Sequence, residues 1–397
     1  MPAFGRPMLE QWSLDPAITY LNHGTVGAPP RRVLAHQAAL RQEMELQPSR
    51  FVLRELATRL AGSPGAPWRE QPRLREAIAG VAPFLGVKAA DLVFVPNVTA
   101  GLNAVLQALP LADGDEVVMT DLAYGAIAMA ADFAARRRGA KVTTVATPFP
   151  LRRAEQVTEA VLAAITPRTR LLVVDHVAAG TALVLPVAEI AAECHRRGVD
   201  VLVDGAHAPG SIALDIASLG VDWYAANLHK WAHAPRSCGI LWAAPDRQAG
   251  LHPPVISWGH GLSFIEEFEM TATGDPTAYL AAPEGIALLE EWGFAGVLAY
   301  IHELAWEGAL WLTGYWGTEL TTPRAMAGAM VTVALPERAG SSAEDAAALR
   351  LALLVEDGIE VQLHERRGRL WARVSAQVYN DMADMERLAQ AVLRRLP

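Results

Sequence analysis

Seven short runs of apolar and β-branched residues dominate the chain between residues 92 and 242. The runs do not alternate with polar residues, which is typical of strands buried on both faces of a mostly parallel sheet. Amphipathic stretches between them, such as residues 152–165 and 187–197, have the period of helices that cover such a sheet. The runs occupy residues 92–95, 116–119, 142–145, 171–175, 201–204, 223–226 and 239–242. The pattern predicts an α/β fold whose large domain contains a mostly parallel seven-stranded sheet.

The segments on either side of this block predict a second, smaller domain. Residues 282–316 have the pattern of one long helix or a broken pair. Strands and helices then mix in the order typical of an α+β unit. The strands are predicted at residues 330–335, 359–363 and 370–374, and the helices at residues 343–355 and 384–396. Before the block, residues 31–60 predict a helical hairpin, and residues 1–30 are irregular.

We therefore expect three parts along the chain. Residues 1–30 form an N-terminal segment that contributes to the small domain and to the active site. Residues 31–280 form the large domain, which binds the cofactor discussed below. Residues 281–397 form the smaller C-terminal α+β domain.

Composition and charge exclude several classes of protein. Of the 397 residues, 52% are hydrophobic and 19% are charged, which is too apolar for a disordered chain. The net charge is −9 and no basic run exceeds Arg136-Arg137-Arg138, so a nucleic-acid partner is not expected. The first residues lack a continuous apolar stretch, and later apolar stretches are interrupted by polar residues. We expect a cytoplasmic protein with no membrane partner.

Cysteine and histidine spacing gives no support for a metal or a disulfide framework. The only cysteines, Cys194 and Cys238, have no CxxC or ligand spacing, so we interpret them as core residues. His229 and His233 have the i, i+4 spacing of a helical metal pair, but no third ligand accompanies them. No metal is expected.

Polar side chains follow three of the predicted strands. In an open parallel sheet, ligands bind beyond the carboxyl ends of the strands. The polar turn 96–101 opens a helix, and either Asn97 or Thr99 caps that helix or the helix start holds a phosphate. Asp204 ends one strand, and Lys230 follows the next, among Asn227, His229 and Trp231. That setting can lower the pKa of the lysine and make it a nucleophilic amine.

An aspartate, a lysine and a phosphate cradle at neighbouring strand ends are what pyridoxal 5'-phosphate requires. The lysine forms a Schiff base with the cofactor aldehyde, and the helix start neutralises the phosphate. The aspartate keeps the pyridine nitrogen protonated, so that the ring accepts electrons. The three signals together predict this cofactor.

At these residues the chain resembles the class V aminotransferase group of fold-type I pyridoxal-phosphate enzymes, and most closely its isopenicillin N epimerase branch. The resemblance runs from Leu21-Asn22-His23-Gly24 to the segment that ends in Val378-Tyr379-Asn380, and it is most specific at residues 204–210 and 227–231. It implies a fold-type I transferase that acts on an amino acid. It also implies a homodimer with shared active sites.

The resemblance implies roles for particular residues. Lys230 would bind the cofactor, Asp204 would pair with the ring nitrogen, and His207 would lie close to the ring hydroxyl and the Schiff base. Arg373 would clamp the substrate α-carboxylate by two parallel hydrogen bonds, with Asn22 and His23 near the same substrate. The remaining cofactor contacts would come from Thr99, the Ala100 N–H, Asn227 and His229 at the phosphate, Tyr124 stacked on the ring, and Thr273 reaching the neighbouring subunit's phosphate.

The chain departs from the family pattern at two places. Residues 177–180, after His176, supply no side-chain donor to the ring hydroxyl, which leaves either His207 or Thr181 for that bond. Ala272 replaces a usual glycine beside Thr273.

Several reactions remain open at such a site. Epimerisation and transamination differ in where the proton returns after Lys230 removes it from Cα. No cysteine lies beyond Cys238, which disfavours a desulfurase that forms a protein persulfide. A C–S lyase without a protein thiol and a non-catalytic binding protein with a retained fold are the alternatives. The sequence does not identify the substrate side chain; we expect His23 and His260 to contribute to its pocket.

Overall fold

The large domain is built on a seven-stranded sheet with the order β2-β8-β7-β6-β5-β3-β4. The computed structural model describes residues 3–58 and 71–396 of the chain. Strand β8 is antiparallel to both of its neighbours, and all other pairings in this sheet are parallel. The strands are β2 (Leu92–Val95), β3 (Glu116–Thr120), β4 (Lys141–Val145), β5 (Thr169–Asp175), β6 (Asp200–Asp204), β7 (Trp223–Asn227) and β8 (Gly239–Ala243). The predicted α/β fold with a mostly parallel sheet is confirmed.

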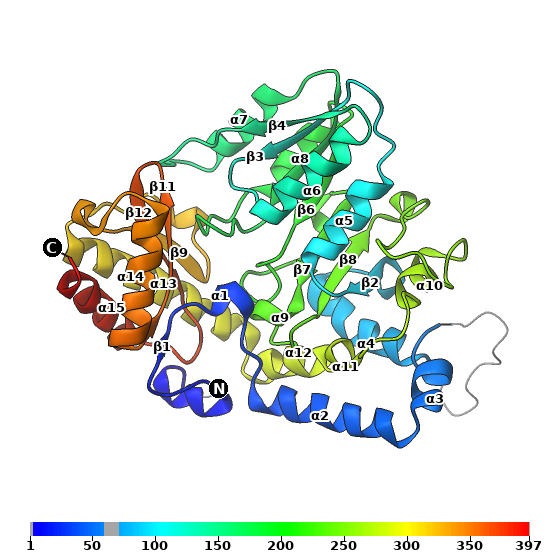
Figure 1. Cartoon of the computed structure of the whole chain (residues 1–397), viewed down its shortest axis with the longest axis horizontal. Helices are drawn as coiled ribbons and strands as arrows, with labels where there is room; N and C mark the ends of the chain where they lie inside the picture. Colours follow the sequence, from blue (N-terminus) through cyan, green and yellow to red (C-terminus); the bar gives the residue numbers. More distant parts are fainter. Residues whose placement is uncertain (1–2, 59–70, 397) are drawn as a thin grey trace.

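Helices cover both faces of this sheet (Figure 1). They are α4 (Arg73–Val81), α5 (Val98–Ala108), α6 (Gly125–Arg136), α7 (Glu155–Ala164), α8 (Val187–His195), α9 (Leu228–Trp231), α10 (Phe264–Glu269) and α11 (Thr277–Leu280). Successive residues of β5 point to opposite faces, so Leu171 and Val173 join one core and Leu172 and Val174 join another. Two apolar cores on one strand explain why its sequence is a continuous apolar run.

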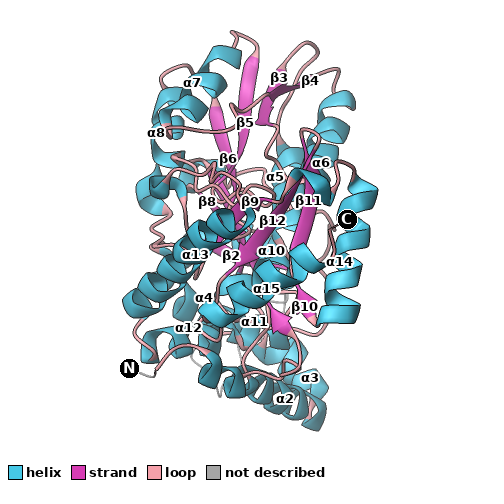
Figure 2. Cartoon of the chain, turned by 90° about the vertical axis from the view of Figure 1, so that its left-hand side faces the viewer, coloured by secondary structure: helices cyan, strands magenta, loops and turns pink. Residues whose placement is uncertain are grey.

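The small domain contains a three-stranded antiparallel sheet with the order β11-β12-β9. Its strands are β9 (Met330–Ala334), β11 (Gln362–Arg366) and β12 (Arg369–Ser375). The helices after the large domain are α12 (Ala282–Glu291), α13 (Phe294–Trp316), α14 (Ala343–Asp357) and α15 (Met382–Arg394). Gly293, with φ 80, separates α12 from α13, so the broken pair is the correct alternative. Figure 2 shows β9, β11 and β12 side by side with α13, α14 and α15 around them.

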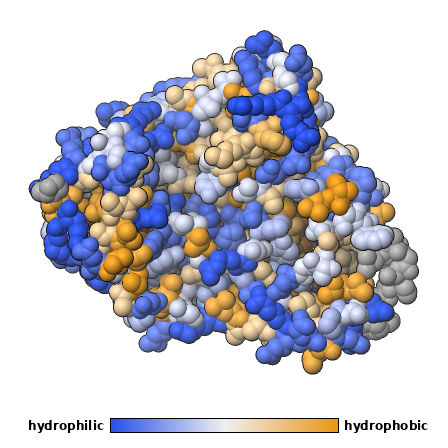
Figure 3. All heavy atoms as spheres, in the orientation of Figure 1, coloured by the Kyte–Doolittle hydropathy of each residue, from blue (hydrophilic) through white to orange (hydrophobic). Residues whose placement is uncertain are grey.

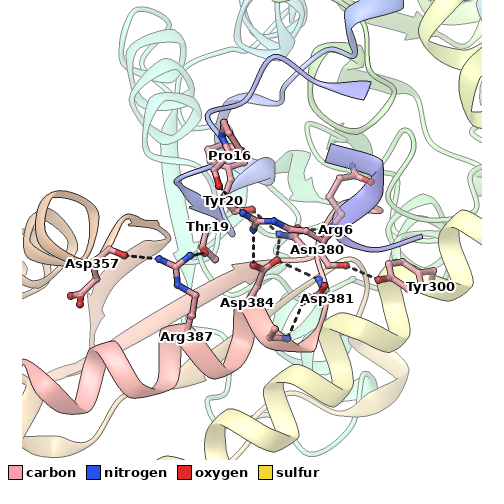
Figure 4. A network of polar contacts seen from close by, with 12 residues as sticks. Arg6, Pro16, Thr19, Tyr20, Tyr300, Asp357, Asn380, Asp381, Asp384 and Arg387 are labelled. Atoms are coloured by element: carbon pink, nitrogen blue, oxygen red, sulfur yellow. Dashed lines mark hydrogen bonds and ion pairs between the residues drawn. The ribbon is translucent and has the colours of Figure 1, made fainter. Parts of the chain in front are cut away.

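The N-terminal segment packs on the small domain. Its strand β1 (Thr19–Tyr20) pairs in parallel with β10 (Ile359–Glu360), and α1 (His23–Val26) follows. Figure 4 shows the polar contacts that fix this segment: the Asn380 amide donates to the Tyr20 carbonyl at 3.1 Å and to Asp384 at 2.9 Å. Arg387 donates to the Thr19 hydroxyl at 2.8 Å. Residues near both ends of the chain therefore build one unit.

The region predicted as a helical hairpin has a different form. Helix α2 (Arg31–Leu46) is long, but it continues into the short α3 (Pro48–Arg50) and a π-helical turn, η2 (Phe51–Glu55). Pro48 removes a backbone N–H at the start of α3. The last two residues of the predicted hairpin, 59 and 60, lie outside the described residues. Short 3₁₀ turns complete the fold at Arg6–Gln11, Ala82–Leu85, Ala89–Asp91, Ala217–Leu219, Pro245–Arg247, Arg324–Met326 and Glu337–Ala339.

The surface drawn in Figure 3 mixes polar residues with small, separate groups of apolar residues. Among the described residues, every helix is either too short or too polar to cross a bilayer.

Candidate active site

A cavity of about 540 Å³ lies where the carboxyl ends of β5, β6 and β7 face the small domain. The strand ends on the large-domain side supply acids and bases, and β11 and β12 supply the opposite wall. Eight predicted site residues line it: Thr99, Tyr124, Asp204, His207, Asn227, His229, Lys230 and Arg373. The other four, Asn22, His23, Ala100 and Thr273, lie elsewhere.

Lys230 is held in the cavity by a short helical turn. Strand β7 ends at Asn227, and the buried Leu228 and Trp231 anchor α9, which leaves Lys230 and His229 on the cavity side. Gly27 packs against this turn with φ 66, and a Cβ there would lie 1.9 Å from the His229 carbonyl oxygen. Only glycine therefore fits at position 27.

The Lys230 amine faces the His207 imidazole, with Nζ 3.1 Å from Nε2. Burial lowers the pKa of Lys230 to about 8; the Arg373 charge acts in the same direction and the Asp204 charge against it. Burial also lowers the pKa of His207 well below its usual value, so the ring is neutral at pH 7. A neutral imidazole beside an amine of lowered pKa is a setting for nucleophilic and proton-transfer chemistry.

Asp204 carries an oxygen that has no partner. Its Oδ1 accepts the Ala206 backbone N–H at 2.9 Å, whereas its Oδ2 is buried without a hydrogen bond. Burial raises the pKa of this carboxyl. An unpaired buried carboxylate oxygen is costly, and a cationic N–H donor would satisfy it. The protonated pyridine nitrogen of pyridoxal phosphate is such a donor.

Of the two capping candidates at the start of α5, Asn97 is the residue that caps the helix. Its Oδ1 accepts the Ala100 N–H at 3.0 Å. Asn227 Oδ1 accepts the Val98 N–H at 2.9 Å, which ties the end of β7 to the same turn. The Ala100 N–H is thus already bonded, and the side chains of Thr99, Asn227 and His229 remain on the cavity side. His229 Nδ1 bonds the Cys238 carbonyl at 2.9 Å, which leaves Nε2 for a ligand.

Arg373 comes from β12 and is 4% exposed. Its guanidinium donates to the Ala179 carbonyl and the Thr25 hydroxyl, both at 2.6 Å, and to Asn22 Oδ1 at 3.3 Å. Its Nε is buried without a partner. Burial lowers the pKa of Arg373 to about 10, so the group stays cationic at neutral pH. An oriented cation with an unused N–H is suited to a carboxylate.

The structure places two predicted substrate residues behind the cavity wall. His23 is fully buried, with Nε2 2.8 Å from the Lys230 carbonyl oxygen and Nδ1 2.9 Å from the Tyr379 hydroxyl. Asn22 bonds Glu360 and receives a bond from Arg373. In this arrangement His23 positions the backbone of Lys230, and Asn22 positions Arg373.

Thr273 lies outside the cavity, on the loop between α10 and α11. It lines a separate hollow of about 370 Å³ together with Ala100 and Pro96. Its neighbour Ala272 has φ 111, a backbone conformation that favours glycine, which agrees with the glycine that the family resemblance implies at this position. His260 also lies away from the cavity, with Nδ1 3.8 Å from Glu267 Oε2.

The sequence did not single out four further cavity residues: Thr25, Asp175, Gln362 and His364. Asp175 pairs in register with Asp204 across β5 and β6, and burial and the Asp204 charge raise its pKa well above the usual value. Its signal was present, because it is a carboxylate at the end of a buried strand. Thr181, one candidate for the ring hydroxyl, has a buried hydroxyl without a partner and does not line the cavity.

The fold and the site define a pyridoxal-phosphate-dependent enzyme of fold type I. A family model for class V aminotransferases matches residues 62–388, and the chain belongs to that family.

Relatives and solved structures agree with this assignment. The chain is 35% identical to an isopenicillin N epimerase of Amycolatopsis lactamdurans, over 96% of each chain. It is 31% identical to a probable chloroplastic L-cysteine desulfhydrase of Arabidopsis thaliana, over 95% of this chain and 83% of that one. A C-DES variant with glycine covalently linked to its pyridoxal-phosphate cofactor superposes with a TM-score of 0.78 at 22% identity, over 99% of this chain and 98% of that one.

Proposed function

We propose that this enzyme acts at the Cα of an amino acid, with the epimerase or aminotransferase chemistry of isopenicillin N epimerase-like enzymes. The observation that carries the proposal is that Lys230, Asp204, with its unpaired oxygen, and Arg373 line the same cavity. The 35% identity to an isopenicillin N epimerase supports it. A binding protein without catalysis would not need all three groups.

Bound pyridoxal phosphate supplies an electron sink for the bond broken at Cα. Arg373 binds the α-carboxylate and so orients the amino acid over the large-domain wall. The Lys230 amine takes the Cα proton, because its lowered pKa leaves a useful fraction uncharged near neutral pH. Asp204 holds the proton on the ring nitrogen, and the His207 ring positions Nζ.

We also propose a homodimer with shared active sites. Thr273 lies outside the cavity of its own chain, so a role at a cofactor phosphate requires a second subunit. Mixing two inactive variants tests this. Lys230→Ala and Thr273→Ala chains should regain activity when they are mixed, and sedimentation shows whether the mixture has assembled. Failure of a correctly assembled mixture to regain activity would contradict shared sites.

A C–S lyase without a protein persulfide is the second candidate. Both cysteines are buried, and burial raises the pKa of Cys194 to about 12 and that of Cys238 still further. Neither thiol is suited to accept sulfur. The desulfhydrase relatives favour this candidate over a desulfurase that uses its own cysteine.

Two measurements test these proposals. Borohydride treatment of the yellow holoenzyme should fix the cofactor on Lys230, as read by peptide mass spectrometry; labelling at another lysine would overturn the site. Incubation with amino acids in heavy water should then give Cα exchange with inversion for an epimerase or keto acid for an aminotransferase. Sulfide and pyruvate from cysteine would indicate the lyase, and no reaction with any amino acid would favour the binding protein.

A further inference from the structure

Three nitrogen atoms without hydrogen-bond partners lie along one face of the small-domain sheet. They are His364 Nε2 and Arg366 Nε on β11 and Arg373 Nε on β12, and all three are buried. His364 and Arg366 are two residues apart, so they share one face of their strand. Gln362, two residues earlier, is the register partner of Arg373, which puts Arg373 on the same face. His364 and Arg373 both line the active-site cavity.

Donors left unpaired in a buried setting cost free energy, and a ligand that brings acceptors removes that cost. Arg373 is assigned to the α-carboxylate, but His364 and Arg366 have no role in that contact. One terminal nitrogen of Arg366 pairs with Asp121 at 2.9 Å, and its Nε is left over. The site therefore has donors for a second group of acceptors, beyond the α-carboxylate.

The charges around His364 favour an acid over a neutral group. Burial lowers the pKa of His364 to about 4, and the Arg373 and Arg366 charges act in the same direction while the Glu365 charge opposes them. The ring is therefore neutral near pH 7 and offers one N–H. A carboxylate in the cavity would accept from His364 Nε2 in the tautomer that carries the proton there, and it would lie near the Arg373 guanidinium. Arg366, on the same strand face as His364, adds positive charge, which its ion pair with Asp121 partly offsets.

We propose that the substrate is an amino acid with an acidic side chain, and that His364, supported by Arg366, is the residue that selects it. This assignment rests on the proposed function, because it takes the Arg373 contact with the α-carboxylate as given. The α-carboxylate and the side-chain acid would then contact the same sheet face, at β12 and β11.

Calorimetry on the holoenzyme tests the proposal without turnover. Glutarate and pentanoate have equal carbon chains and differ only in the second carboxylate. We expect glutarate to bind at least about tenfold more tightly, the usual worth of one charge-assisted hydrogen bond. His364→Leu and Arg366→Gln should each remove most of that preference. Equal binding of the two acids by the unaltered enzyme would overturn the proposal.

Matched variants separate selection from general effects. Arg324 lies in the 3₁₀ turn Arg324–Met326, outside the small-domain sheet, and pairs with Glu303, so Arg324→Gln removes the same charge and should keep the preference for glutarate. His364→Gln keeps an N–H donor and should retain more of the preference than His364→Leu. An equal loss in Arg324→Gln and Arg366→Gln would overturn the assignment to β11. These binding assays need no reaction. They can therefore fail while Lys230 labelling succeeds, and Lys230 labelling can fail while they succeed.

Discussion

The two walls of the active-site cavity differ in how the chain builds them. The large-domain wall comes from successive strand ends: Asp175 and Asp204 end β5 and β6, and Lys230 follows β7, all between residues 175 and 230. The small-domain wall joins distant parts of the chain: the Arg373 guanidinium binds the Thr25 hydroxyl across 348 positions.

The walls also differ in their chemistry. The large-domain wall holds the acid and the amine that we propose act on the reacting bond, with the Lys230 pKa lowered by burial. The small-domain wall holds oriented cations and buried nitrogen atoms without partners among the described residues, which are suited to carboxylates. Changes in the first wall should therefore lower kcat, and changes in the second should raise KM.

The largest effect is expected from Lys230→Ala. Loss of the amine removes both the cofactor bond and the base, so turnover of the best amino acid should fall at least ~10³-fold. Lys141→Ala is the control, because Lys141 lies on the edge strand β4 and pairs with Glu116. Steady-state kinetics check this, and a loss of turnover below tenfold would contradict the assignment of catalysis to the large-domain wall.

Arg373→Lys should act mainly on binding. A lysine keeps the charge but loses the planar set of donors, so KM should rise by about 10–100-fold, the worth of hydrogen bonds to a charged group. The control is Arg369→Lys. If kcat falls while KM stays constant, the two walls do not divide chemistry from binding in this way.

The pH dependence of cofactor capture sharpens the comparison. Only the neutral amine bonds to the aldehyde, so the rate for apoenzyme should rise about tenfold per pH unit and level off near the Lys230 pKa of about 8. Arg373→Gln removes a neighbouring cation, which should move the plateau to higher pH. Stopped-flow absorbance checks both. A rate that still rises steeply from pH 9 to 10 would mean that burial does not lower this pKa.

The smallest effect is expected from a substitution at Ala272, on a loop outside both walls. Ala272 has φ 111, so Ala272→Gly should relieve strain and raise the free energy of unfolding by ~0.5–1 kcal/mol. At Ala327, where φ is −88, the same change should lower it by a similar amount. Urea unfolding measures both, and a destabilised Ala272→Gly variant would contradict the strain at this position.

Much of the large-domain wall could be predicted from the sequence, since each functional residue follows an apolar run. Asp175 ends a predicted strand just as Asp204 does, yet it was not singled out as a site residue. The small-domain wall was harder to predict from the sequence. The predicted strand ended at residue 363, whereas the structure has β10 and then β11 (Gln362–Arg366), so His364 was not assigned to a strand. The burial of His23 depends on Tyr379 and the Lys230 carbonyl, which no local pattern connects to it.

The contact of residues 23–27 with the turn that carries Lys230 has a consequence for biosynthesis. Tyr20 and Asn22, just before these residues, are translated at least 338 positions ahead of their partners Glu360, Ser375 and Asn380. The support of the lysine turn is therefore complete only after residue 380 has been made, and a nascent chain that ends before this residue would carry the amine without the contacts that orient it.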